Sequence, residues 1–126
     1  MENVNTIQKF GKLNDVYVVD EVGNGGANHN YLIQYELFPV GGEVEVHEVA
    51  RIQFQNGPRK SEEAIHGVLD TDLLEIVRHR LQGFQKGEFA TRENAVALTH
   101  IEEALLWMNK RVEDRIERNI LGTYSK

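Results

Sequence analysis

Arginine is the residue type in this sequence that is best suited to binding chemistry. Six of the eight arginines follow residue 70, and three of them, Arg111, Arg115 and Arg118, recur at helical spacing. Guanidinium groups form forked hydrogen bonds with phosphates and stack on nucleobases. Spacing alone favours a solvated helix face on which these arginines pair with glutamates one turn away. The functional alternative is a row of planar cations that holds a small anionic ligand.

Two other residues lie near a predicted turn between helices. Phe84 follows Gly83, where its ring can plug a core or serve as a stacking platform. Asn94 lies in the first turn of the next predicted helix, where it can cap the helix. The N–H groups of such a helix start can also meet an anion. Both residues are therefore candidates for ligand contact.

The sequence lacks the motifs of several enzyme classes. It has no cysteine and no Walker loop, and its only serines, Ser61 and Ser125, lie outside a G-x-S-x-G elbow. No pair of histidines has the H-E-x-x-H spacing of a zinc site. His79 and His100 each have a glutamate at helical spacing, which leaves a carboxylate–histidine metal or hydrolytic site as an alternative. We expect no catalytic residue, no metal and no cofactor.

The charge is distributed unevenly. The chain of 126 residues has 14 basic and 20 acidic groups, a net charge of -6. Residues 1–70 carry all of this net charge, and residues 71–126 are neutral. A net acidic chain argues against a nucleic-acid polymer as partner, but not against a small anion held by local arginines. No apolar run is long enough to span a membrane and the first residues lack a signal-peptide pattern, so we expect a cytoplasmic protein.

The period of the apolar residues changes near residue 70. Strand-like runs at residues 16–19, 31–38 and 44–52 are separated by turn residues, including Gly25-Gly26, and predict an antiparallel meander. Helical periodicity then predicts helices over residues 72–84 and about 91–120, with Asp70 or Thr71 and Thr91 as caps. We predict a single α+β domain over 1–126. Its antiparallel sheet part is 1–69, and a helical hairpin at 70–126 is expected to carry oligomerisation and ligand binding.

The second predicted helix is long for a chain of this size. Thirty residues make about 45 Å of helix, whereas a compact domain of 126 residues is about 36 Å across. Leu105, Leu106 and Trp107 are consecutive, which widens the apolar face. An overhanging apolar helix needs a partner, and another copy of the chain is the commonest one. We therefore predict a homo-oligomer.

Residues 81–105 carry a recognisable motif, R-E-N-A-x-A-L-T-x-x-E-E-A-L, which starts at Arg92. It resembles that of the phage Thoeris anti-defence proteins of the first described type, whose helical hairpin is shared with anti-CBASS cyclic-dinucleotide sponges. The shorter segments GGANH at 25–29 and QFQNGP at 53–58 agree with this resemblance. The likeness covers roughly residues 15–124.

The resemblance implies a sponge that acts in the cytoplasm of the infected bacterial host. Members of the family bind glycocyclic ADP-ribose (gcADPR) made by TIR proteins and do not cleave it, and some also bind cyclic di- or trinucleotides at a separate site in a hexamer. The site residues implied for this sequence are Phe84 stacking on adenine, Asn94 as a hydrogen-bonding group, Arg111 and Arg115 on bases, phosphate or ribose, and Arg59 and Lys60 at the second nucleotide site.

Helix geometry limits how these residues can meet. Asn94 and Arg111 are seventeen positions apart, which is about 26 Å along one helix. If both contact one ligand, Arg111 must come from an antiparallel partner helix, which gives two equivalent pockets in a homodimer. A dimer and a hexamer both satisfy this geometry. The competing hypotheses are a cyclic-nucleotide-cleaving enzyme and a protein-binding adaptor.

Overall fold

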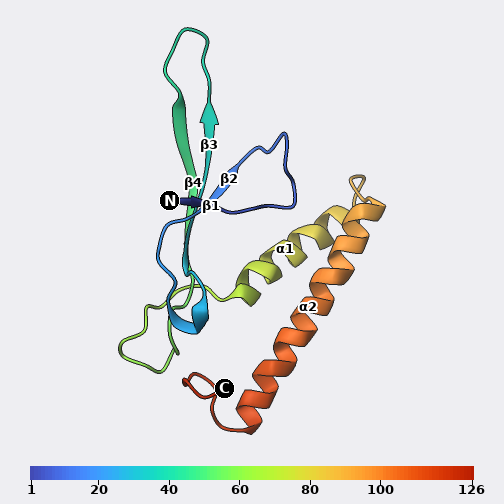
Figure 1. The fold of residues 1–126 in the computed structure, drawn as a ribbon. Helices are drawn as coiled ribbons and strands as arrows, with labels where there is room; N and C mark the ends of the chain where they lie inside the picture. The colour runs from blue at the N-terminus through green and yellow to red at the C-terminus, as the bar shows by residue number, and fades with distance from the viewer. The chain divides into compact units, whose positions relative to one another are not determined.

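The computed structural model describes residues 1–126 and divides the chain into two compact units. The sheet unit contains Met1–Gly57 and Ile65–Gly67, and the hairpin unit contains Pro58–Ala64 and Val68–Lys126. All strands belong to the first unit and both long helices to the second (Figure 1). The predicted α+β class is therefore confirmed, while a single domain stays a prediction.

The sheet unit is an antiparallel sheet of four strands in the order β1-β2-β3-β4. The strands are β1 (Glu2–Asn3), β2 (Asp15–Val18), β3 (Asn30–Leu37) and β4 (Glu45–Gln53). The last three lie within one or two residues of the predicted runs. The sequence analysis missed β1 because a strand of two polar residues has no periodicity to detect.

The centre of the sheet lies on β3. Leu32 is its buried apolar residue, and Gln34 on the same face is buried as well. A bulge lies opposite the Ile33–Gln34 step, where Val49 of β4 has no partner. Val46 and Val49 are each about half exposed. The valines of β4 are therefore not buried within this unit.

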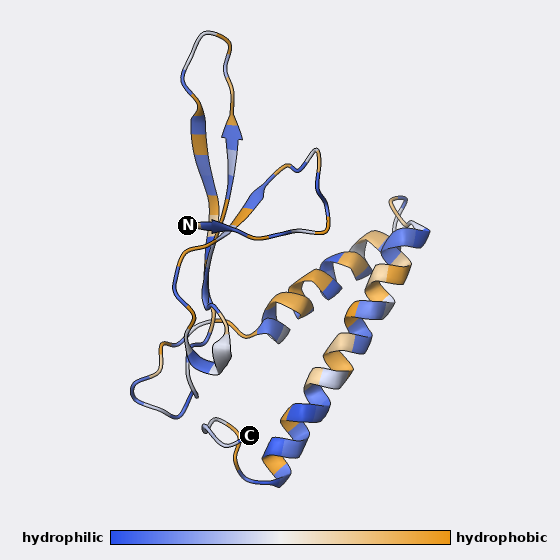
Figure 2. Ribbon diagram, in the orientation of Figure 1, coloured by the Kyte–Doolittle hydropathy of each residue, from blue (hydrophilic) through white to orange (hydrophobic).

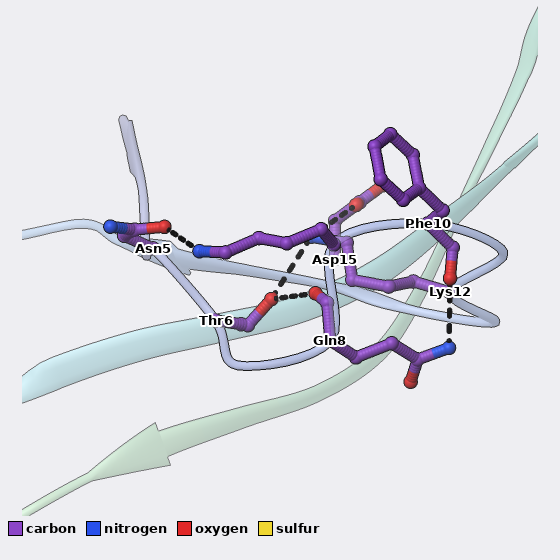
Figure 3. Close-up of polar contacts among 7 residues, drawn as sticks. Asn5, Thr6, Gln8, Phe10, Lys12 and Asp15 are labelled. Carbon is purple, nitrogen blue, oxygen red and sulfur yellow. Dashed lines mark hydrogen bonds and ion pairs between the residues drawn. The ribbon is translucent and has the colours of Figure 1, made fainter.

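Local contacts shape the two loops between the first strands. The loop before β2 is held by polar contacts among its own residues: Lys12 donates to Thr6 at 3.3 Å and pairs with Asp15 at 3.6 Å (Figure 3). Between β2 and β3, the turn Asn24–Gly26 places Gly25 and Gly26 at φ of 74° and 81°. Glycine adopts this left-handed backbone without a steric penalty, which explains the pair.

The hairpin unit is built from α1 (Asp70–Gln85) and α2 (Arg92–Glu117). Thr91 caps α2 as predicted, with its Oγ1 accepting from the Asn94 N–H at 3.0 Å. The predicted cap of α1 is wrong: the cap is Leu69, whose N–H donates to the Asp72 carboxylate at 2.8 Å. The Asp72 N–H in turn donates to the Leu69 carbonyl at 3.0 Å, so a backbone acceptor takes the place of a capping side chain.

The second helix is shorter than predicted. Its 26 residues make about 39 Å, because the chain leaves the helix at Arg118 and Asn119 takes a positive φ of 56°. The two helices meet at their turn and diverge toward their other ends (Figure 1). Neither has an apolar stretch of the length and hydropathy needed to cross a membrane.

An ion pair joins the two helices. Arg78 of α1 donates from Nε to Glu102 of α2 at 2.8 Å and also pairs with Glu75 at 3.4 Å. The hydrogen bond with Glu102 raises the pKa of Arg78 above its ordinary value, so the guanidinium stays charged. Figure 2 shows apolar residues along both helices. None of these apolar residues is buried in the chain, and Leu106 and Trp107 are 70% and 69% exposed.

Candidate functional site

The first part of the candidate site is the turn end of the hairpin. Phe84 lies in the last turn of α1 and is partly buried. Arg80, one turn earlier, places its guanidinium carbon 5.2 Å from the centre of the Phe84 ring. The ring therefore has a face that accepts a flat cationic group, which favours the stacking platform over the core plug. Sequence reasoning missed Arg80, although its i,i+4 spacing from Phe84 is a detectable signal.

A side-chain amide holds the turn. Gln85 donates from Nε2 to the Thr91 carbonyl at 3.1 Å, and its Oε1 accepts from the Thr91 N–H at 3.0 Å. Thr91 in turn accepts from the Asn94 N–H. These three bonds fix the start of α2 relative to the end of α1, so Phe84 and Asn94 belong to one ordered turn. The Asn94 side chain is partly buried and makes no hydrogen bond of its own.

The other predicted arginines lie toward the far end of α2. Arg111 is exposed and has no carboxylate within ion-pair distance. The helix is continuous between Asn94 and Arg111, so these residues are separated by about 26 Å in one chain. The structure thus does not bring Arg111 to Phe84 and Asn94 within a single chain.

Arg115 has a different environment from Arg111. It is 7% exposed, and its guanidinium donates to the carbonyls of Ser125, Thr123 and Ile120 at 2.5, 2.9 and 3.1 Å. The residues after α2 therefore fold back around this side chain. Arg118 pairs with Asp114 at 3.5 Å. Within the predicted row, Arg115 and Arg118 thus have partners in the chain, and only Arg111 leaves its guanidinium uncommitted.

The predicted second site lies near this C-terminal segment. Arg59 and Lys60 are both exposed. The Lys60 N–H donates to the Gly122 carbonyl at 3.4 Å, and a Cβ on Gly122 would lie 3.1 Å from the Lys60 Cγ. The two cations are thus placed beside the segment that covers Arg115. They are not part of the turn that holds Phe84 and Asn94.

A groove of about 720 Å³ runs along the hairpin. Its walls come from both helices and the residue before α1, and are mostly apolar around the Arg78–Glu102 ion pair; they are formed by Leu69, Thr71, Glu75, Arg78, Glu102, Leu105, Leu106, Asn109 and Val112. A shallower depression nearby is lined by Trp107 and Lys110, whose ammonium lies 5.1 Å from the Trp107 ring centre. Sequence reasoning expected an apolar face here.

The histidines lie in separate environments along the chain. No set of three histidine, aspartate or glutamate side chains is close enough to hold a metal ion. His100 lies 3.7 Å from Glu103, and both are exposed. Glu75 pairs with Arg78, so the predicted neighbour of His79 is already engaged.

The two shorter motif segments meet in the sheet unit. The Phe54 N–H donates to the His29 carbonyl at 2.7 Å, and next to these segments Asn24 donates to Asn56 at 2.8 Å. The His29 N–H also donates to the Asp20 carboxylate at 2.9 Å. Partial burial opposes the charge of Asp20, but hydrogen bonds from the backbone N–H groups of His29 and Asn30 favour it, and its pKa lies below the usual 3.8.

The lowered pKa of Asp20 predicts a dependence of stability on pH. A carboxylate with a lower pKa in the folded state stabilises the fold above the unfolded pKa, and this contribution disappears as pH falls through the folded pKa. We expect Asp20→Asn to lower the melting temperature at about pH 6 and to have a smaller effect at about pH 3, below the usual pKa of 3.8. Thermal melts at both pH values test this, with exposed Glu21→Gln as the control; a difference independent of pH would contradict it.

The helical hairpin matches a known family of proteins. The Acb2/Tad1 hairpin-domain model matches residues 47–113, more than half of the chain, and the chain belongs to that family. The resemblance that the hairpin motif indicated is thus confirmed. A similar protein is "Thoeris anti-defense 1" of Bacillus phage SBSphiJ7, which is 47% identical over 79 residues. The match covers 63% of this chain and 55% of that protein, so it spans little more than half of the relative's length.

Proposed function

We propose that this protein counteracts Thoeris immunity by binding and sequestering gcADPR without cleaving it. The observation that carries the proposal is the family match, which spans Phe84, Asn94 and Arg111. The name of the phage relative points to the same biological role. The exposed, uncommitted guanidinium of Arg111 and the ring face of Phe84 offer the two kinds of contact that a nucleotide signal needs.

The proposed pocket is shared between two copies of the chain. Phe84 stacks on the adenine and Asn94 donates a hydrogen bond, while Arg111 of an antiparallel second copy contacts phosphate or ribose. Because the residues come from two chains, the separation of about 26 Å within one helix no longer prevents them from contacting the same ligand. Stacking contributes about 1–3 kcal/mol, and each charge-assisted hydrogen bond about 1.5–3 kcal/mol. A few such contacts reach nanomolar affinity after the entropy of association is subtracted.

The same proposal assigns the remaining predicted residues. The exposed Leu106 and Trp107 contribute to the homodimer surface, and dimers assemble further into a hexamer. Arg59 and Lys60 bind cyclic di- or trinucleotides at the separate site. Arg115 joins the first pocket when its guanidinium is released from the C-terminal carbonyls. The protein acts in the cytoplasm of the infected bacterial host.

Ligand release tests sequestration directly. We expect gcADPR bound to the protein to be recovered intact after heat denaturation, and excess ligand to remain uncleaved. Phe84→Ala and Arg111→Ala should each weaken binding by about tenfold to a hundredfold, the equivalent of one lost stack or charged contact. Arg51→Ala is the matched control, because Arg51 pairs with Glu48 in the sheet unit.

Three outcomes would contradict the proposal. A linear product would show cleavage and favour the enzyme hypothesis. Unchanged affinity in both Phe84→Ala and Arg111→Ala would reject the assigned residues. A strictly monomeric mass by light scattering at micromolar concentration would reject the shared pocket and favour an adaptor whose apolar hairpin face binds another protein.

A further inference from the structure

Arg80 has no carboxylate partner, unlike Arg51, Arg78 and Arg118, which form ion pairs. Arg51 pairs with Glu48 and Arg78 with Glu102, each at 2.8 Å. Arg80 is exposed, and its one specific contact is with the ring of Phe84. A guanidinium that is neither paired nor buried is available for an anion from outside the chain.

The position of Arg80 places it at the proposed base-stacking surface. Its guanidinium carbon lies 5.2 Å from the Phe84 ring centre, so it covers the face on which a base would stack. A cation over a ring at an exposed site contributes only about 0.5–1 kcal/mol. A charge-assisted hydrogen bond contributes about 1.5–3 kcal/mol. Movement of the Arg80 guanidinium from the Phe84 ring to a phosphate is therefore favourable. It leaves that face of the ring free for the base.

We propose that Arg80 is a ligand-binding arginine that leaves the Phe84 ring when a purine stacks there and forms a forked hydrogen bond with a phosphate of the same ligand. The inference rests on the proposed function and deepens it by adding a residue that binds the ligand. The ligand must therefore carry a purine and a phosphate that are separated by no more than the length of an arginine side chain. A nucleotide folded into a small ring meets this condition, whereas a free base does not.

The charge and the shape of Arg80 can be separated by substitution. Arg80→Met keeps an unbranched side chain that can cover the ring but removes the charge. Arg80→Lys keeps the charge but loses the planar fork. Arg51→Ala controls for the loss of one positive charge elsewhere. Isothermal titration with gcADPR measures the affinity of each variant and of the wild-type protein.

We expect Arg80→Met and Arg80→Ala to weaken binding of gcADPR by about tenfold or more, and Arg80→Lys to weaken it by a smaller factor. Arg51→Ala should stay within about twofold of wild type. Wild-type affinity in Arg80→Met would show that Arg80 only packs against Phe84, and would overturn the inference while leaving the proposed function intact. Failure of the wild-type protein to bind gcADPR would overturn both.

Discussion

Gly67→Ala is expected to destabilise the sheet unit by at least about 3 kcal/mol, the range of severe single substitutions. A Cβ on Gly67 would lie 2.2 Å from the Gln53 carbonyl oxygen and 2.6 Å from the Phe54 carbonyl carbon. Both atoms are backbone, so no side-chain rotation relieves the overlap. The segment at residues 65–67 would have to move away from the end of β4.

That movement would break bonds that hold the segment in place. Ile65 and Asn56 exchange two backbone hydrogen bonds of 2.9 Å, and the Gly67 N–H donates to the Gln55 side chain at 3.2 Å. Loss of these bonds adds to the steric penalty. The substitution therefore also disturbs the loop that contains Asn56. The side chain of Asn56 accepts a hydrogen bond from Asn24.

Urea unfolding monitored by circular dichroism measures the effect. Gly83→Ala is the matched control, because Gly83 lies inside α1 and a Cβ there meets no atom within 4 Å. This control should be neutral or stabilise the protein by up to about 1 kcal/mol, since alanine is the better helix former. A free energy of unfolding for Gly67→Ala within 0.5 kcal/mol of wild type, as for a typical surface substitution, would contradict the steric argument.

Arg115→Ala is expected to release the C-terminal segment from the end of α2. Three carbonyls share the buried guanidinium, and hydrogen bonds from a charged donor contribute about 1.5–3 kcal/mol each. Ordering the segment offsets part of this energy. We therefore expect the amide of Thr123 to lose about a hundredfold of its protection against hydrogen exchange.

Hydrogen exchange of the Thr123 and Ile120 amides is the appropriate measurement, because it reports this segment rather than global unfolding. Arg111→Ala is the control: Arg111 is one turn earlier, exposed and without a carboxylate partner. Equal protection in wild type and Arg115→Ala would show that the segment is held by other contacts. The result also decides how the affinity of an Arg115 variant for gcADPR should be interpreted, since a released segment can itself alter the site.

Local sequence signals predicted the elements whose causes are local. Thr91 was found because a threonine before a helical period supplies its own acceptor to the first turn. The start of α1 was misplaced because its cap bond comes from Asp72, inside the helix. The bulge at Val49 could not be predicted, because it depends on the register of β4 with β3, which the sequence of one strand does not determine.

The candidate site also contains residues that the sequence predicted and residues that only the structure reveals. Phe84, Asn94 and Arg111 followed from the hairpin motif, and their roles stay predictions. The environment of Arg115 could not be predicted, because its partners are backbone carbonyls that any sequence supplies. The two hydrogen bonds that Gln85 forms with Thr91 depend on the conformation of the five residues between them. The availability of Arg80 is known only once the partners of the other arginines have been assigned.

The unbroken α2 helix also constrains how this protein can change in length during evolution. Each inserted residue would turn the Arg111 end by about 100° and move it by about 1.5 Å relative to Asn94. A seven-residue insertion would restore the direction of Arg111 around the helix axis to within about 20°. It would also add about 10 Å to the distance between Asn94 and Arg111. We therefore expect insertions and deletions among relatives after residue 117, and a constant residue count between Phe84 and Arg111.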